Sequence, residues 1–171
     1  MLLAFQVRAE NVVTCDQVSL ARPGHGAAYR GTVKNSDYGL SAAIPREFTG
    51  WGAAIGAPFH GFIIYLDNHQ GAQAACIDFR VALHVELPED LPGPLPQRSK
   101  SANVRVGNLT GRETSDRGSV NGTQLVNETI TVQRERSDGT DDVTITFVSP
   151  TAETGRTKPT FERFLSHLRF E

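Results

Sequence analysis

The sequence predicts a mostly β protein, an antiparallel β-sandwich or flattened barrel of about eight strands with one C-terminal α-helix. One long segment alternates strictly between apolar and polar residues, and turn-rich stretches separate further alternating segments. Near the end of the chain, a stripe of apolar residues has helical spacing. The 171 residues suffice for one core, so we expect a single domain over residues 1–171.

The clearest strand is residues 76–87, CIDFRVALHVEL. Its odd-numbered residues are all apolar, whereas its even-numbered residues are mostly ionisable. Successive side chains of a strand point to opposite faces, so this pattern gives one face for the core and one polar face. A helix would place Asp78 and Arg80 within the apolar stripe, which favours the strand.

Two hairpins are expected in the first half of the chain. The apolar segment 59–66, FHGFIIYL, is followed by the turn residues DNHQG and then by strand 76–87. We expect these two strands to pair in the middle of the sheet. The alternating segments 29–33 and 40–44 flank KNSDYG, so they form a second antiparallel pair.

A third hairpin is expected over residues 130–147, because two alternating segments flank Asp-Gly at 138–139. With these two residues at the centre of a type I′ turn, Arg136 lies opposite Asp141 and Val132 lies opposite Ile145. Each face of the predicted hairpin then matches apolar residues with apolar residues and polar residues with polar ones.

Residues 88–122 are expected to form an exposed loop. The segment PEDLPGPLP has four prolines, which cannot donate backbone hydrogen bonds to a sheet. The residues from 97 to 122 are mainly polar and carry charges of both signs, and only the segment 103–106 and its neighbours suggest a short strand. Long loops of this kind often carry function, so we expect an interaction surface here.

A C-terminal helix is expected over residues 160–170, with Thr160 as its N-terminal cap. Its apolar side chains recur at helical spacing, and they are Phe161, Phe164, Leu165 and Leu168. This stripe must pack either on the sheet or on another subunit. We therefore consider these four residues a candidate interface.

The bulk composition is that of an ordinary globular protein. A formal net charge of -2 and a pI near 6.2 argue against nucleic acid and anionic membrane surfaces as partners. The two cysteines, Cys15 and Cys76, are too few for a disulfide framework and are expected to be ordinary small apolar residues. With no convincing signal peptide at the N-terminus, a cytoplasmic location is expected.

Several ionisable side chains could gather near the predicted hairpin of segments 59–66 and 76–87. Histidine with carboxylate is the raw material of a metal site or of an acid–base pair, although the spacing here matches no known motif. The lone tryptophan could lie at the opening of such a pocket. The candidate ligand-binding residues are Trp51, His60, Asp67, His69, Asp78, Arg80 and His84. The alternative is that the polar residues of segment 76–87 form only the solvent-exposed face of a strand.

Two functional hypotheses follow. The first is a non-enzymatic binding or assembly module without a cofactor, which forms a homo-oligomer or binds a protein partner through the loop and the C-terminal helix. The second is a small-ligand or metal-binding β-barrel, which could be an enzyme, built on His60, His69, His84, Asp67 and Asp78. We favour the first, because no catalytic motif is evident.

Overall fold

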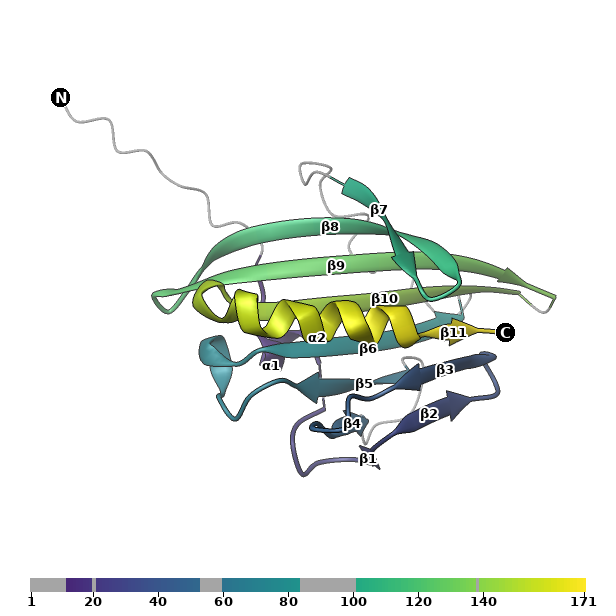
Figure 1. The fold of residues 1–171 in the computed structure, drawn as a ribbon, viewed down its shortest axis with the longest axis horizontal. Helices are drawn as coiled ribbons and strands as arrows, with labels where there is room; N and C mark the ends of the chain where they lie inside the picture. The colour runs from purple at the N-terminus through teal and green to yellow at the C-terminus, as the bar shows by residue number, and fades with distance from the viewer. Residues whose placement is uncertain (1–11, 20, 53–59, 84–100, 138) are drawn as a thin grey trace.

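The computed structural model describes residues 12–19, 21–52, 60–83, 101–137 and 139–171. The described residues form an eight-stranded antiparallel sheet, a three-stranded sheet and one long C-terminal helix (Figure 1). The mostly β, antiparallel fold with a C-terminal helix is therefore confirmed. The large sheet runs from edge strand β1 to edge strand β7, so its described strands do not close into a barrel.

The strands of the large sheet lie in the following spatial order: β1 (Ala28–Tyr29), β4 (Gly50–Gly52), β5 (His60–Tyr65), β6 (Cys76–Leu83), β10 (Gly139–Pro150), β9 (Thr123–Arg136), β8 (Leu109–Val120) and β7 (Ser101–Val106). The small sheet has the order β11 (Arg169–Phe170), β3 (Leu40–Ala43) and β2 (Thr32–Asn35). The helices are α1 (Cys15–Val18), α2 (Thr154–His167) and the short 3-10 turns η1 (Gly71–Gln73) and η3 (Thr151–Glu153). Neither α-helix in this described part is long and apolar enough to cross a bilayer.

Strand β6 confirms the predicted alternation. Ile77, Phe79 and Val81 are buried in the main core, and β5 pairs with β6 as expected from the turn between them. Phe79 stacks on Phe62 of β5, with ring centroids 5.3 Å apart. Residues 84–87 of the predicted strand lie outside the described residues. The pairing of β2 with β3 also confirms the hairpin predicted for segments 29–33 and 40–44, which belongs to the small sheet.

Helix α2 lies over the large sheet (Figure 1), and its apolar stripe belongs to the main core. Phe161 stacks on Phe147 of β10 with centroids 4.8 Å apart, and Phe164 meets Phe79 edge-on at 6.3 Å. The helix is confirmed, but the candidate interface is wrong, because all four of its residues are buried inside the protein: Phe161, Phe164, Leu165 and Leu168. Burial in the core leaves these side chains unavailable to a partner.

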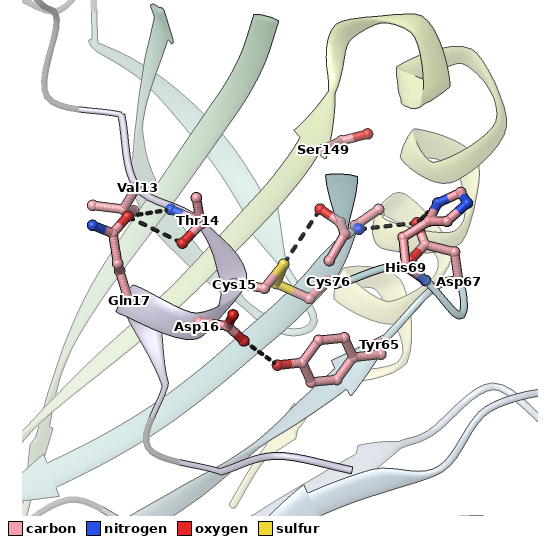
Figure 2. The surroundings of a disulfide bond; sticks show 12 residues. Val13, Thr14, Cys15, Asp16, Gln17, Tyr65, Asp67, His69, Cys76 and Ser149 are labelled. Carbon is pink, nitrogen blue, oxygen red and sulfur yellow. Dashed lines mark hydrogen bonds and ion pairs between the residues drawn. A yellow bond between two sulfur atoms is a disulfide. The ribbon is translucent and has the colours of Figure 1, made fainter. Parts of the chain in front are cut away.

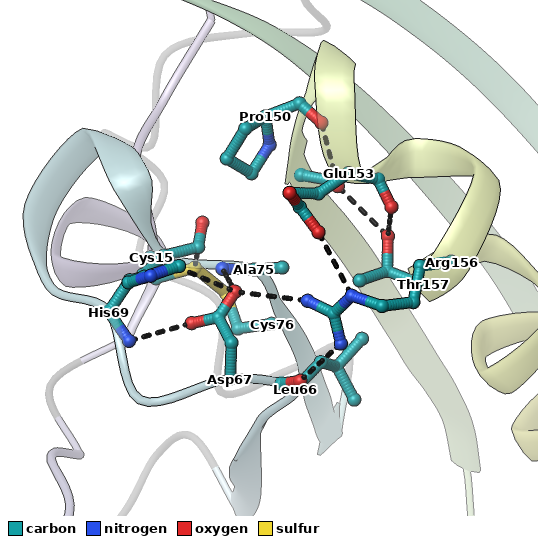
Figure 3. Close-up of polar contacts among 12 residues, drawn as sticks. Cys15, Leu66, Asp67, His69, Ala75, Cys76, Pro150, Glu153, Arg156 and Thr157 are labelled. Carbon is teal, nitrogen blue, oxygen red and sulfur yellow. Dashed lines mark hydrogen bonds and ion pairs between the residues drawn. A yellow bond between two sulfur atoms is a disulfide. The ribbon is translucent and has the colours of Figure 1, made fainter.

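The helix also begins earlier than expected, at Thr154, and contains Pro159. The residue before a proline disfavours the helical conformation, so Pro159 lies at an unusual position inside the helix. Hydrogen bonds near the start of the helix support it (Figure 3). Thr154 Oγ1 donates to the Pro150 carbonyl at 3.2 Å, and Thr157 Oγ1 donates to the Glu153 carbonyl at 2.9 Å.

The β9–β10 hairpin is confirmed, but its register differs from the predicted one by two residues. Val132 lies opposite Val143, and Arg134 lies opposite Asp141. The shift is an even number of residues, so every side chain stays on its predicted face. The observed register places the buried Arg134 and Asp141 in direct contact as an ion pair.

The Arg134 guanidinium joins the two sheets. Besides Asp141 it donates to the backbone carbonyls of Tyr38, of Gly39 at 3.2 Å and of Glu171 at 3.4 Å. These carbonyls lie at the β2–β3 turn and just after β11, whereas Arg134 belongs to the large sheet. Arg134 is 8% exposed and Asp141 is 0% exposed. Removing one partner of such a pair leaves an uncompensated buried charge, which is strongly destabilising.

The prediction of an exposed loop over residues 88–122 is wrong for its second part, because residues 101–106 form strand β7 and residues 109–120 form strand β8. Residues 88–100 lie outside the described part of the chain. Most side chains of β7 and β8 are exposed or half-buried, so neither strand carries a clear apolar alternation. Their turns do carry a signal: Asn121 and Gly122 both have positive φ, at 51° and 81°, as a two-residue hairpin turn requires.

The two cysteines form a disulfide, so the expectation of ordinary apolar residues is wrong. Cys15 of α1 and Cys76 of β6 have their Cα atoms 6.0 Å apart, although 61 positions separate them in the sequence (Figure 2). The bond pins α1 to the sheet face opposite α2. There the two cysteines form a second, smaller core cluster with Ala21, Ile63, Ala74 and Val148.

Reduction of this disulfide should destabilise the fold. A cross-link across 61 positions removes unfolded-state entropy worth about 4 kcal/mol in the loop-closure model, and measured losses are often about 2–4 kcal/mol. Urea unfolding with and without a thiol reductant should show a loss in this range. The Cys15→Ser/Cys76→Ser double variant is the control, because its stability should not respond to the reductant. Equal midpoints for oxidised and reduced wild-type protein would contradict the expectation.

Candidate functional site

The face of the large sheet opposite α2 carries a cavity of about 1010 Å³, here called the sheet-face cavity. Its wall is built by side chains and backbone from β6, β10, β9, β8 and β7, and Val18 of α1 lies at its border. The side chains that point this way are the polar members of each alternating strand. The same alternation that fills the core on one side therefore makes a polar wall on the other.

One row of polar side chains crosses five strands of this wall. Pairing the strands in register places each of its members opposite the next: Asn103 of β7, Arg112 of β8, Thr131 of β9, Thr144 of β10 and Arg80 of β6. All five line the sheet-face cavity. The row offers amide, hydroxyl and guanidinium groups, which together provide many hydrogen-bond donors.

Asp78 and Arg80 form an ion pair at the β6 side of this cavity. Arg80 Nε donates to Asp78 Oδ2 at 2.7 Å, and Ser19 also hydrogen-bonds to the Asp78 carboxyl. Asp78 is only 4% exposed, whereas Arg80 is partly exposed. Burial raises the pKa of Asp78 to about 6, although Arg80 and Ser19 both act in the opposite direction.

Three other predicted ligand residues line a separate cavity of about 540 Å³, here called the loop cavity. They are Trp51, Asp67 and His69. Asp67 already has structural partners, because it accepts hydrogen bonds from the backbone N–H groups of His69 at 3.0 Å and Ala75 at 2.9 Å (Figures 2 and 3). Arg156 of α2 also approaches it, at 3.9 Å. Asp67 therefore organises the β5–β6 connection and its contact with α2.

Tyr65 and Asp16 lie at the same cavity, close to the disulfide (Figure 2). The Tyr65 hydroxyl donates to Asp16 Oδ1 at 3.2 Å. Burial, followed by the Asp16 charge and this hydrogen bond, raises the pKa of Tyr65 to about 12. The phenol thus stays protonated at neutral pH and holds α1 against β5.

The seven predicted ligand residues do not form one site. Asp78 and Arg80 meet at the sheet-face cavity, and the loop cavity holds another three. His60 is the first residue of β5, where its backbone pairs with Val81, and His84 lies outside the described residues. Among the residues that are described, no three His, Cys, Asp or Glu side chains are placed to hold a metal ion.

Arg112 lies in the segment that was expected to be an exposed loop, and Asn103 lies at the short strand suggested within that segment. Thr131 and Thr144 were expected on the polar face of a hairpin. The missed signal was the pair of turn dipeptides Gly107-Asn108 and Asn121-Gly122, which mark both ends of β8 as hairpin turns.

The buried Asp78 should make stability depend on pH. Its pKa is higher in the folded protein, at about 6, than its ordinary value of 3.8, so protonation favours the fold. This stabilisation is complete below about pH 4 and is lost as the pH rises through 6. Each pKa unit corresponds to about 1.36 kcal/mol, so this stabilisation amounts to about 3 kcal/mol.

The measurement compares wild-type protein with Asp78→Asn in urea unfolding from pH 4 to pH 8. The difference in unfolding free energy should move in favour of the variant as the pH rises through 6. Asparagine keeps the shape of the side chain but cannot ionise, so constant differences between the two proteins across this range would refute the expectation.

No protein-family model matches the sequence, and no curated protein matches it. Among the solved structures that share the fold are LpqN and a protein of Bacteroides thetaiotaomicron VPI-5482. LpqN, described as involved in cell envelope biogenesis of Mycobacterium tuberculosis, superposes with a TM-score of 0.57 and 13% identity over 84% of this chain and 91% of LpqN. A protein of Bacteroides thetaiotaomicron VPI-5482 gives a TM-score of 0.53 and 11% identity over 86% of this chain. The match spans 49% of the Bacteroides protein, about half its length.

Proposed function

We propose that this chain is a non-enzymatic binding domain that holds a small organic ligand in the sheet-face cavity. The observation that carries the proposal is the row of five hydrogen-bonding side chains across the wall of a cavity of about 1010 Å³. Ligand sites are typically concave, with a few polar groups that fix the orientation of the ligand. Binding through the stripe of α2 is not part of this proposal, because that stripe lies in the core.

We further propose that the domain works in an oxidising compartment of the cell envelope, in place of the cytoplasmic location expected from the sequence. The Cys15–Cys76 disulfide supports this, because the cytosol keeps most thiols reduced. The fold shared with LpqN, a protein described as involved in cell envelope biogenesis, agrees with it. At 13% identity the likeness concerns the fold, so the compartment is inferred mainly from the disulfide.

The ligand proposal can be tested with three eight-carbon probes that differ only in head group, octanoate, octylamine and octanol. At least one should bind saturably, as measured by calorimetry and by a rise in melting temperature. Thr131→Trp should abolish this binding by filling the cavity from an exposed wall position. Ser119→Trp, at an exposed position of β8 outside the cavity wall, is the matched control and should retain it. Absence of binding by every probe would refute the proposal.

Self-association is a second candidate function, now placed at strand β7 rather than at α2. β7 is the end strand of the large sheet in the described part, and most of its residues are exposed. An edge strand presents backbone groups that can pair with another chain. Light scattering after size-exclusion chromatography should then give a dimer mass that falls on dilution. A monomer at every concentration would rule out this candidate.

A further inference from the structure

Arg112 is a charged residue in the wall of the sheet-face cavity. Its side chain makes no hydrogen bond or ion pair with any described residue, and Thr131 Oγ1 donates to its backbone carbonyl at 3.5 Å. The other charges of the wall differ in this respect. Arg80 is bound to Asp78, and Asp142 accepts a hydrogen bond from Gln133 at 3.4 Å. Within the described part of the chain, the Arg112 guanidinium is therefore left for a ligand in the cavity.

The neighbours of Arg112 can donate to the same ligand. Asn103 and Thr131 flank it in the polar row, and Thr110 lies two residues before it on β8. All three line the cavity. A guanidinium has five N–H donors in a planar fork that matches the two oxygens of a carboxylate or phosphate, and hydroxyl and amide groups can satisfy the remaining lone pairs.

The size of the cavity indicates that the ligand is larger than a free inorganic ion. About 1010 Å³ is at the upper end of the volumes that hold organic ligands. Beyond the polar row the wall includes Val18 of α1, Ala82 of β6 and Thr146 of β10. These surfaces can cover an apolar body that extends from Arg112 toward α1.

We propose that the sheet-face cavity binds an amphipathic organic anion, whose carboxylate or phosphate head is held by Arg112 with Asn103, Thr110 and Thr131. The inference rests on the proposed function and adds the chemical class of the ligand. Arg80, fixed by Asp78 at the other end of the row, keeps further N–H donors for the same molecule.

The test measures the affinity of octanoate, octyl phosphate, octylamine and octanol by calorimetry, each below its aggregation concentration. Octanoate and octyl phosphate should bind more tightly than the neutral and cationic probes, and the tighter of the two identifies the preferred head group. Arg112→Ala should weaken their binding at least about tenfold, the effect of losing a charged hydrogen bond. The affinity of Arg112→Lys should lie between those of the wild type and Arg112→Ala, because lysine keeps the positive charge but lacks the planar fork of N–H donors.

Arg117→Ala is the matched control. Arg117 lies on the same strand, is also exposed and does not line the cavity, so its removal changes the net charge equally and should leave the affinities unchanged. Equal losses in the two variants would overturn the assignment of Arg112. So would tighter binding of octanol or octylamine, which would still leave the cavity as a binding site. If inorganic phosphate binds as tightly as octyl phosphate, the proposal that the ligand has an apolar body is contradicted.

Discussion

Side-chain alternation along β6, β10 and β9 is the constraint on which both sides of this molecule depend. The apolar members of these strands fill one core together with α2 and the small sheet. Their polar members are left on the opposite face, where they form the wall of the sheet-face cavity. A shift of one residue in any pairing would exchange the two sets. The core therefore fixes the geometry of the candidate site without contributing side chains to the polar row.

Two long-range connections, one polar and one covalent, hold the parts of the fold in place around this sheet. Arg134 reaches three carbonyls that belong to the surroundings of the small sheet, and it is held by Asp141. On the other face the disulfide fixes α1, which is too short to be stable by itself. Both connections link residues far apart in the sequence. Each holds a small element against the large sheet.

Periodicity was sufficient to predict the central strands, the hairpins that join them and the faces of their side chains. It could not fix the β9–β10 register, because a two-residue shift preserves every face, and the buried contact of Arg134 with Asp141 decides between the alternatives. β8 was missed because exposed strands have little apolar signal. The pairing of Cys15 with Cys76 depends on tertiary proximity alone. Only half of the candidate site was predicted, because Arg112 lies on the exposed strand β8.

Helix α1 belongs to both cavities. Asp16 lines the loop cavity, and Val18 lines the sheet-face cavity. The disulfide from Cys15 to Cys76 ties the helix to β6. Any displacement of α1 would therefore change the wall of both cavities at once. One covalent bond to β6 thus fixes the part of the chain that two otherwise separate surfaces share.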